Sequence, residues 1–104
     1  MKIGYTYILT NFNRTSLYIG CTNDIERRVL EHKSGVGSIH TTRYHLKYLM
    51  YFDESPSMME AIAREKQLKN WHKQWKWNLI KEENPDLLDL AHDWYSEGDI
   101  QSTL

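Results

Sequence analysis

The hydrophobic and polar positions at the start of the chain alternate in short blocks. Two runs rich in tyrosine and β-branched residues, Gly4–Thr10 and Ser16–Thr22, flank the polar stretch Asn11–Thr15. Short runs of this composition, separated by a few polar residues, are typical of two antiparallel strands joined by a turn. The sequence therefore predicts a β-hairpin over residues 4–22.

The pattern then changes to a helical period. The apolar residues that follow it are Ile25, Val29 and Leu30. Spacing of three to four residues is typical of one face of an α-helix. Asn23 and Glu26 fit a capping box, in which each side chain accepts from a backbone N–H group of the first turn. Gly35 is a stop signal, so the hairpin is predicted to lead directly into a helix.

The middle of the chain predicts one further strand and one further helix. A loop rich in Gly, Ser and Thr over Ser34–Thr42 leads into a strand over Tyr44–Phe52. Ser57 and Glu60 form a second capping box, and the helix that they begin is predicted to end near Asn70. On that helix we expect Glu65 to share a face with Ile62 and Leu68, which point into the core.

Two more helices are predicted after residue 70. Trp71–Glu83 carries aromatic and apolar residues four apart, a stripe that is more often core than a base-stacking surface. Asn84 would cap the last helix, with Pro85 in its first turn. Its apolar side would consist of Leu87, Leu88, Ala91, Trp94 and Tyr95. The tail Gly98–Leu104 is expected to be frayed.

Together these elements predict an α+β fold: a small central antiparallel sheet of about three strands flanked by helices. The length of 104 residues suits one domain, and 40% hydrophobic residues exclude general disorder. We place the domain at residues 1–91 and regard residues 92–104 as the acidic end of the last helix and a tail.

Charge is distributed unevenly along the chain. The net charge is −1, but residues 1–81 carry all 13 Lys and Arg against 7 acids, and residues 82–104 carry 7 acids and no Lys or Arg. The first part, at +6, is suited to a phosphate backbone. The second, at −7, could cap the domain, repel non-target nucleic acid or keep the protein in solution, and the last role is the simplest. No segment has the pattern of a signal peptide or the length of a membrane span. The single cysteine, Cys21, is expected to be a small strand-end filler, and a reducing cytoplasm is the default location.

Several polar side chains would meet on one face of the hairpin. Side chains alternate along a strand, so Tyr5 and Tyr7 share a face, as do Tyr18 and Gly20. On the following helix, residues 28 and 32 are neighbours, an arginine and a histidine. Two interpretations stay open from spacing alone: a phosphate-handling surface, or ordinary strand tyrosines beside a solvated helix charge.

A resemblance favours the first interpretation. Tyr5-Thr6-Tyr7 and Tyr18-Ile19-Gly20 stand 11 positions apart, counted between Tyr7 and Tyr18, and Arg28 follows ten positions after Tyr18. With His32 and the later segment Ala61–Gln67, these motifs resemble the GIY-YIG nuclease family in its small single-domain branch. The resemblance covers most of the chain, from residue 4 to residue 90.

The resemblance implies roles for five residues. Glu65 would be the metal ligand, holding one Mg²⁺ or Mn²⁺. Arg28 would donate to the scissile phosphate as charge develops. Tyr7 would be the base or the phenol that orients water, with Tyr18 sharing that role, and His32 would orient a group or relay a proton. For Glu65 the alternative is a salt bridge with a neighbouring arginine.

Further residues are expected to contact nucleic acid. They are Gly20, which would let the substrate backbone approach closely, together with Arg27, Lys33, Arg43, Tyr44 and Lys69. His40 stands where the family usually has an aromatic residue in the loop before the third strand. The family also has a late polar ligand, and the candidates in this chain are Asn78, Asn84 and Asp89.

The expected function is a metal-dependent endonuclease that hydrolyses DNA phosphodiester bonds, with structural or weak sequence selectivity. Branched, nicked and single-stranded DNA are the substrate forms left open. The alternatives are a nucleic-acid-binding module with weak catalysis and a protein-interaction domain that uses an aromatic C-terminal helix. So small a domain is expected to bind weakly and in a salt-sensitive manner.

Overall fold

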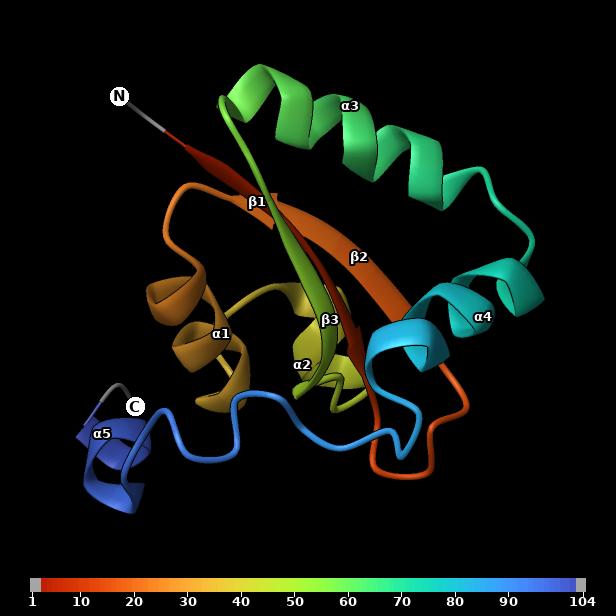
Figure 1. Cartoon of the computed structure of the whole chain (residues 1–104). Coiled ribbons are helices and arrows are strands. Elements are labelled where there is room, and N and C mark those ends of the chain that lie inside the picture. The colour runs from red at the N-terminus through yellow and green to blue at the C-terminus, as the bar shows by residue number, and fades with distance from the viewer. Residues whose placement is uncertain (1–2, 103–104) are drawn as a thin grey trace.

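The computed structural model describes residues 3–102. Within that range the chain forms three strands and five helices (Figure 1). In order they are β1 (Gly4–Thr10), β2 (Leu17–Thr22), α1 (Ile25–Lys33), α2 (Ile39–Arg43), β3 (Tyr48–Ser55), α3 (Met58–Lys69), α4 (Lys73–Glu83) and α5 (Glu97–Ser102). Among the described residues, no helix is both long and apolar enough to cross a bilayer.

The three strands form one antiparallel sheet in the order β2-β1-β3. β1 is central, so both of its edges are paired, and β2 and β3 are the edge strands. Tyr7 lies opposite Gly20 on β2 and opposite Phe52 on β3. A bulge interrupts the β1–β3 ladder between Ile8 and Leu9. The predicted α+β class with a small antiparallel sheet is confirmed.

Helices cover both faces of the sheet. The core on the α1 side consists of Tyr7, Leu9, Ile25, Val29, Leu46, Leu49 and Ala91. The core on the α3 and α4 side consists of Ile8, Ile19, Met50, Tyr51, Leu68 and Ile80. Neighbouring residues of β1 fall into different cores because side chains alternate along a strand. Figure 1 shows α1 and α3 on opposite sides of the strands.

The cap of α1 differs from the prediction. Asp24, in an extended conformation, is the N-cap, and its side chain accepts from the backbone N–H of Arg27. The capping box predicted at Asn23 and Glu26 is therefore wrong by one residue. Asp24 is itself held by a bond from its N–H to the hydroxyl oxygen of Thr22, at the end of β2, and this contact selects it over its neighbour.

The loop predicted over residues 34–42 contains the short helix α2. Ser38 caps it by accepting from the N–H of Thr41. β3 then begins at Tyr48 rather than at Tyr44, which is the C-cap of α2. His45 has a φ of 54°, a left-handed conformation that ends the helical turn and turns the chain toward the strand.

The predicted starts of α3 and α4 had different outcomes. Ser57 accepts from the N–H of Glu60 and begins α3, as predicted. α4 begins at Lys73, two residues later than expected, and has no side-chain cap at His72. The buried residues of α3 are Ala61 and Leu68, whereas Ile62 is exposed. Trp75 is also exposed, by 54%, so the expectation that these two residues face the core was wrong.

The predicted helix after residue 84 does not form. Leu87 has a φ of 54°, which a right-handed helix cannot include. Asn84 ends α4 as its C-cap, and its buried side chain donates to the carbonyl oxygens of Met50 and Leu88 instead of beginning a following helix. The segment runs irregularly along β3 to α5, which packs on α1. The expected frayed tail is therefore helical as far as Ser102, and residues 103–104 lie outside the described range.

Candidate active site

The site is organised around a hydrogen bond between β1 and α1. The Tyr7 hydroxyl lies 2.9 Å from Nε2 of His32, and both side chains are buried, Tyr7 with 1% exposure. The second ring nitrogen of His32, Nδ1, lies 2.9 Å from the hydroxyl of Thr41 on α2. That hydroxyl lies 2.8 Å from the hydroxyl of Ser38. The four polar side chains form a continuous row across three elements.

The imidazole in this row is neutral. Burial, followed by the positive charge of Arg28, lowers the pKa of His32 to about 4. A neutral imidazole has one N–H donor and one acceptor nitrogen. With either tautomer, one ring nitrogen of His32 donates and the other accepts, so the ring bridges the hydroxyls of Tyr7 and Thr41. The row therefore links Tyr7 to Ser38 through the two nitrogens of one neutral ring.

The two tyrosines of the motifs differ in environment. Burial raises the pKa of Tyr7 above its ordinary value, and the interaction with Arg28 opposes that rise only in part. Tyr18, on the edge strand β2, is only partly buried. Its ring lies 6.3 Å from that of Tyr7 and 5.6 Å from that of His32, between centroids. The phenol of Tyr18 is thus the one that can meet a molecule from solvent.

An aromatic row continues outward from Tyr18. His40 stacks on it, with centroids 6.1 Å apart and planes at 26°, and Tyr44 lies 4.9 Å from His40. Tyr44 is half exposed, and the Arg43 guanidinium lies 5.7 Å from its ring centroid. The residue with which this chain departs from the family pattern, His40, therefore keeps a stacking position beside the site.

Arg28 faces the same region from α1. Its Nη1 donates to Glu31 at 2.9 Å, and the side chain is 25% exposed. Desolvation alone would lower the pKa of Arg28, but hydrogen bonds with Glu31 and Tyr7 raise it. The guanidinium is thus held in place, stays charged, and keeps part of its surface open to solvent.

Two glycines leave space for the side chains of Tyr7 and His32. A Cβ atom at Gly20 would lie 2.5 Å from the Tyr7 hydroxyl oxygen, and one at Gly37 would lie 2.3 Å from Nδ1 of His32. Both distances are far below van der Waals contact. Gly20 therefore accommodates Tyr7, a structural task that differs from the predicted close approach of a substrate backbone.

Glu65 lies on the other face of the sheet from the tyrosines, next to the edge strand β2. It lies on α3, partly buried, with Oε1 3.3 Å from Nζ of Lys69. Its closest link to the sheet is Cys21 of β2: burial and a hydrogen bond with Glu65 raise the pKa of the thiol to about 11. Cys21 also interacts electrostatically with Tyr7. The edge strand β2 thus separates Glu65 from the tyrosines, and no activated thiol is present at Cys21.

The donors around Glu65 fit a cation that keeps most of its water. Within residues 3–102, no three His, Cys, Asp or Glu side chains are grouped so as to hold a metal ion. One partly exposed carboxylate is the kind of donor set that Mg²⁺ uses when substrate and water complete its shell. Glu65 is the residue of this site that would hold the ion.

The other residues predicted to contact nucleic acid have different surroundings. Arg27 is exposed and pairs with Glu31 at 3.0 Å. Lys69 is exposed beside Glu65. Lys33 is not available: only 10% of its side chain is exposed, and it pairs with Asp89 and donates to the carbonyl oxygen of Lys47. Its role is to tie α1 to the C-terminal segment.

The three candidates for a late polar ligand also differ in burial and in hydrogen-bond partners. Asn84 is buried against β3. Asp89 accepts from the N–H of Leu49 and pairs with Lys33. Asn78 lies exposed on α4, where it accepts from Gln74 at 2.9 Å. Asn84 and Asp89 therefore have structural tasks, and Asn78 is the candidate that faces solvent.

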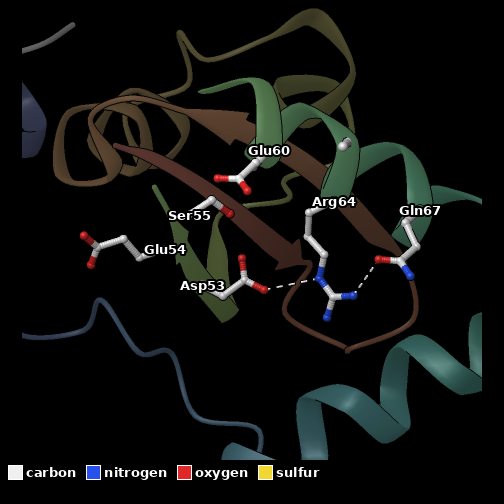
Figure 2. A pocket seen from close by; sticks show the side chains of 7 residues that line it. Asp53, Glu54, Ser55, Glu60, Arg64 and Gln67 are labelled. Atoms are coloured by element: carbon white, nitrogen blue, oxygen red, sulfur yellow. Dashed lines mark hydrogen bonds and ion pairs between the residues drawn. The ribbon is translucent and has the colours of Figure 1, made fainter. Parts of the chain in front are cut away.

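A separate hollow lies at the other edge of the sheet, between β3 and α3 (Figure 2). Arg64 bridges it, donating to Asp53 at 3.3 Å and to Gln67 at 2.8 Å. Glu54 and Glu60 add negative charge to its wall. Since β3 and β2 are opposite edges, this acidic hollow is distinct from the tyrosine site.

Sequence reasoning missed Thr41, which bonds to His32, and Ser38, which bonds to Thr41. A serine such as Ser38 is a common N-cap and could have indicated the start of a short helix. That helix start places Thr41 against the imidazole of His32.

Comparison with known proteins decides the family. A family model described as the GIY-YIG catalytic domain matches residues 3–78, which include the tyrosine motifs, Arg28, His32 and Glu65. The chain belongs to the GIY-YIG family. That membership implies a nuclease domain that acts on nucleic acid, in a family that generally uses divalent metals. The predicted resemblance is thereby confirmed.

Several relatives are UPF0213 proteins. One from Haloquadratum walsbyi is 35% identical over 78 residues, covering 75% of this chain and 86% of that protein. One from Clostridium perfringens is 36% identical over 87 residues, covering 79% and 92%. One from Staphylococcus saprophyticus is 36% identical over 67 residues, covering 64% and 82%. No solved structure shows a significant match.

Proposed function

We propose that this GIY-YIG protein is a metal-dependent endonuclease that hydrolyses DNA phosphodiester bonds. The observation that supports it best is the bonded pair Tyr7–His32, fixed beside the charged Arg28 and the solvent-facing Tyr18. Two tyrosines that only pack in a sheet would need neither a hydrogen bond to a neutral histidine nor a guanidinium beside them.

In the proposed reaction, water attacks the phosphorus, the bond to the leaving sugar oxygen breaks, and the proton released by the attacking water passes through solvent to the leaving oxygen. Arg28 donates to the non-bridging oxygens as negative charge builds there. Tyr18 orients the attacking water, and the row from Tyr7 through His32 to Thr41 keeps the phenols in place. Burial and the raised pKa of Tyr7 support a positioning task for it rather than direct contact with water.

Glu65 would hold the divalent cation, Mg²⁺ or Mn²⁺. The ion would supply Lewis-acid polarisation of the phosphate oxygens. Lys69 pairs with the same carboxylate, and its exposed ammonium would contact a flanking phosphate. Arg27, Arg43 and Tyr44 are exposed around the site and would contact the flanking backbone.

The test is nicking of supercoiled plasmid with Mg²⁺ or Mn²⁺, beside EDTA. We expect wild-type protein to nick only with metal, and Glu65→Gln and Arg28→Ala to lose about 100-fold or more of the rate, since each removes a charge that acts in the transition state. Glu60→Gln is the matched control, because Glu60 is an exposed carboxylate on the same helix.

Two results would contradict the proposal. One is nicking that survives EDTA, and the other is equal activity in wild-type and Glu65→Gln protein. Arg28→Lys adds a further check: it keeps the charge but not the planar fork, so its rate should fall between those of wild type and Arg28→Ala. A protein that binds DNA but never cuts it would be the binding module named above.

A further inference from the structure

The junction of α3 and α4 carries an unusual combination of charge and aromatic surface. Between residues 66 and 81 there are five lysines and no acidic residue. The same segment contains Trp71, His72, Trp75 and Trp77. Lysines interleaved with aromatic side chains are typical of surfaces that bind single-stranded nucleic acid, because phosphates meet the ammonium groups and bases stack on the rings.

Trp75 is the residue that distinguishes this surface from ordinary core. It is 54% exposed, although its four-residue spacing from Trp71 predicts a core position. Two neighbouring rings pack edge to face against its ring: Trp71, with centroids 6.3 Å apart, and His72, with centroids 5.0 Å apart. An exposed indole fixed in one orientation loses little conformational freedom when a base stacks on it.

The lysines lie along a path that begins at Glu65. Lys69 pairs with Glu65 and is exposed. Lys76 donates to the backbone carbonyl oxygen of Lys69 at 3.4 Å, and Lys73 donates to that of Thr15, just before β2. Figure 1 shows α4 near the end of β2 that leads into the β1–β2 turn. The positive charges therefore follow the open edge of the sheet away from the tyrosine site.

Charge also favours a nucleic acid over a protein partner with an apolar face. The only cation stacked on this cluster, among the described residues, is Arg64, 5.5 Å from the Trp71 ring centroid, and it is paired with Asp53 on the far side. The ammonium groups of Lys73 and Lys76 donate to backbone carbonyl oxygens and not to carboxylates. Their charge is therefore left for a polyanion.

We propose that Trp75, His72, Lys69, Lys73 and Lys76 form a platform for single-stranded DNA. The platform holds unpaired nucleotides that flank the bond at the tyrosine site, so the favoured substrate has a single-stranded segment rather than a continuous duplex. The statement about cutting rests on the proposed function, whereas the binding itself does not.

Binding is measured in EDTA, so that no cleavage takes place, as the fluorescence anisotropy of labelled oligodeoxythymidine and of a blunt duplex of equal length. We expect the single strand to bind more tightly. Trp75→Ala should weaken its binding by about 5- to 150-fold, the range for loss of one base–aromatic stack. Trp75→Phe keeps a ring and should stay within about threefold of wild type.

A second variant tests the lysines independently of the tryptophan. Lys73→Gln combined with Lys76→Gln should reduce the slope of log affinity against log salt by about 1.4, because each phosphate contact on a single strand contributes about 0.7. Phe12→Ala is the control, since Phe12 is an exposed aromatic residue in the β1–β2 turn, and its affinity should equal that of wild type.

Equal affinity of wild type and Trp75→Ala for the single strand, with a native circular dichroism spectrum for the variant, would overturn the platform. So would a preference for the duplex. The proposed nuclease fails separately: a protein that binds single strands through Trp75 but never nicks DNA keeps the platform and loses the endonuclease, and active Trp75→Ala protein with wild-type affinity does the reverse.

Discussion

At the scale of one residue, packing explains why the second tyrosine motif ends in a glycine, Gly20. It lies opposite Tyr7 on the neighbouring strand, and a Cβ atom there would lie 2.5 Å from the Tyr7 hydroxyl oxygen and 2.6 Å from Cζ. Both atoms belong to a side chain whose ring lies in the core and whose hydroxyl is bonded to His32. The ring cannot move aside without losing that bond.

We therefore expect Gly20→Ala to lower the free energy of unfolding by about 1–3 kcal/mol, the usual cost of overpacking a core. Urea unfolding at neutral pH measures it. Gly98→Ala is the control, because a Cβ atom at Gly98 would meet its closest neighbour at an ordinary 3.6 Å. Equal stability of the two variants would show that Tyr7 yields easily.

His32 gives a prediction about pH. Its pKa is lowered to about 4 in the folded protein, first by burial and then by Arg28, against about 6.5 in the unfolded chain. Between these values the unfolded chain binds a proton that the folded protein does not. Stability is therefore full above about pH 6.5 and falls as the pH is lowered toward 4, by about 3 kcal/mol at most.

Urea unfolding at pH 7, 6, 5 and 4.5 measures this slope. His32→Gln should flatten it, although the variant is less stable at pH 7 because the bond to Tyr7 changes. His92→Gln is the control, an exposed histidine whose removal should leave the slope as in wild type. If wild type and His32→Gln lose stability in parallel, His32 is not the group that titrates.

At the scale of the element, substitutions at the start of α1 test which residue is its N-cap. Asp24 accepts from the N–H of Arg27, whereas Asn23 makes no such bond. Loss of an N-cap side chain costs about 1 kcal/mol. Asp24→Ala should therefore lower the melting temperature, and Asn23→Ala should leave it within about one degree of wild type, as usual for an exposed surface position. Thermal unfolding followed by circular dichroism compares them. The reverse order would restore the sequence-based assignment.

Several elements could be predicted from the sequence because their causes are local. β1 runs over Gly4–Thr10 as predicted, since its residues have strong strand preferences and alternate between two cores. α3 begins after Ser57 as predicted, since the capping side chain and its N–H partner are three residues apart. The association of Tyr7 with His32 could be expected only through the family resemblance.

Other elements depend on contacts between distant residues. α2 spans five residues, too few for a hydrophobic period to show. The segment after Glu83 looks helical in sequence, but the amide of Asn84 donates to Met50, 34 positions away, and Leu87 adopts a left-handed conformation. Glu65 and Tyr7 lie on different faces of the sheet, with β2 between them, and a linear pattern does not show on which face of the sheet a helix packs.

At the scale of the whole molecule, the chain after residue 83 closes the core on the α1 side. Ala91 is buried there, and Trp94 packs on Phe52 with ring centroids 5.6 Å apart. Tyr95 donates from its hydroxyl to the backbone carbonyl oxygen of Glu26 at the start of α1. A boundary at residue 91, as the sequence suggested, would divide this cluster.

Two truncations test which end of the chain the fold requires. A protein of residues 1–91 loses Trp94 and Tyr95, and we expect its free energy of unfolding to fall by about 2–4 kcal/mol, somewhat below the cost of removing a fully buried aromatic residue. A protein of residues 1–96 keeps both and loses mainly α5, with the bond from Ser34 to the Ile100 carbonyl oxygen. It should lose less than about 1.5 kcal/mol, the value of one such bond. Urea unfolding of the three proteins, side by side, decides it. Equal stability of 1–91 and the full chain would mean that residues 92–104 only contribute negative charge, and the core would then end at Ala91.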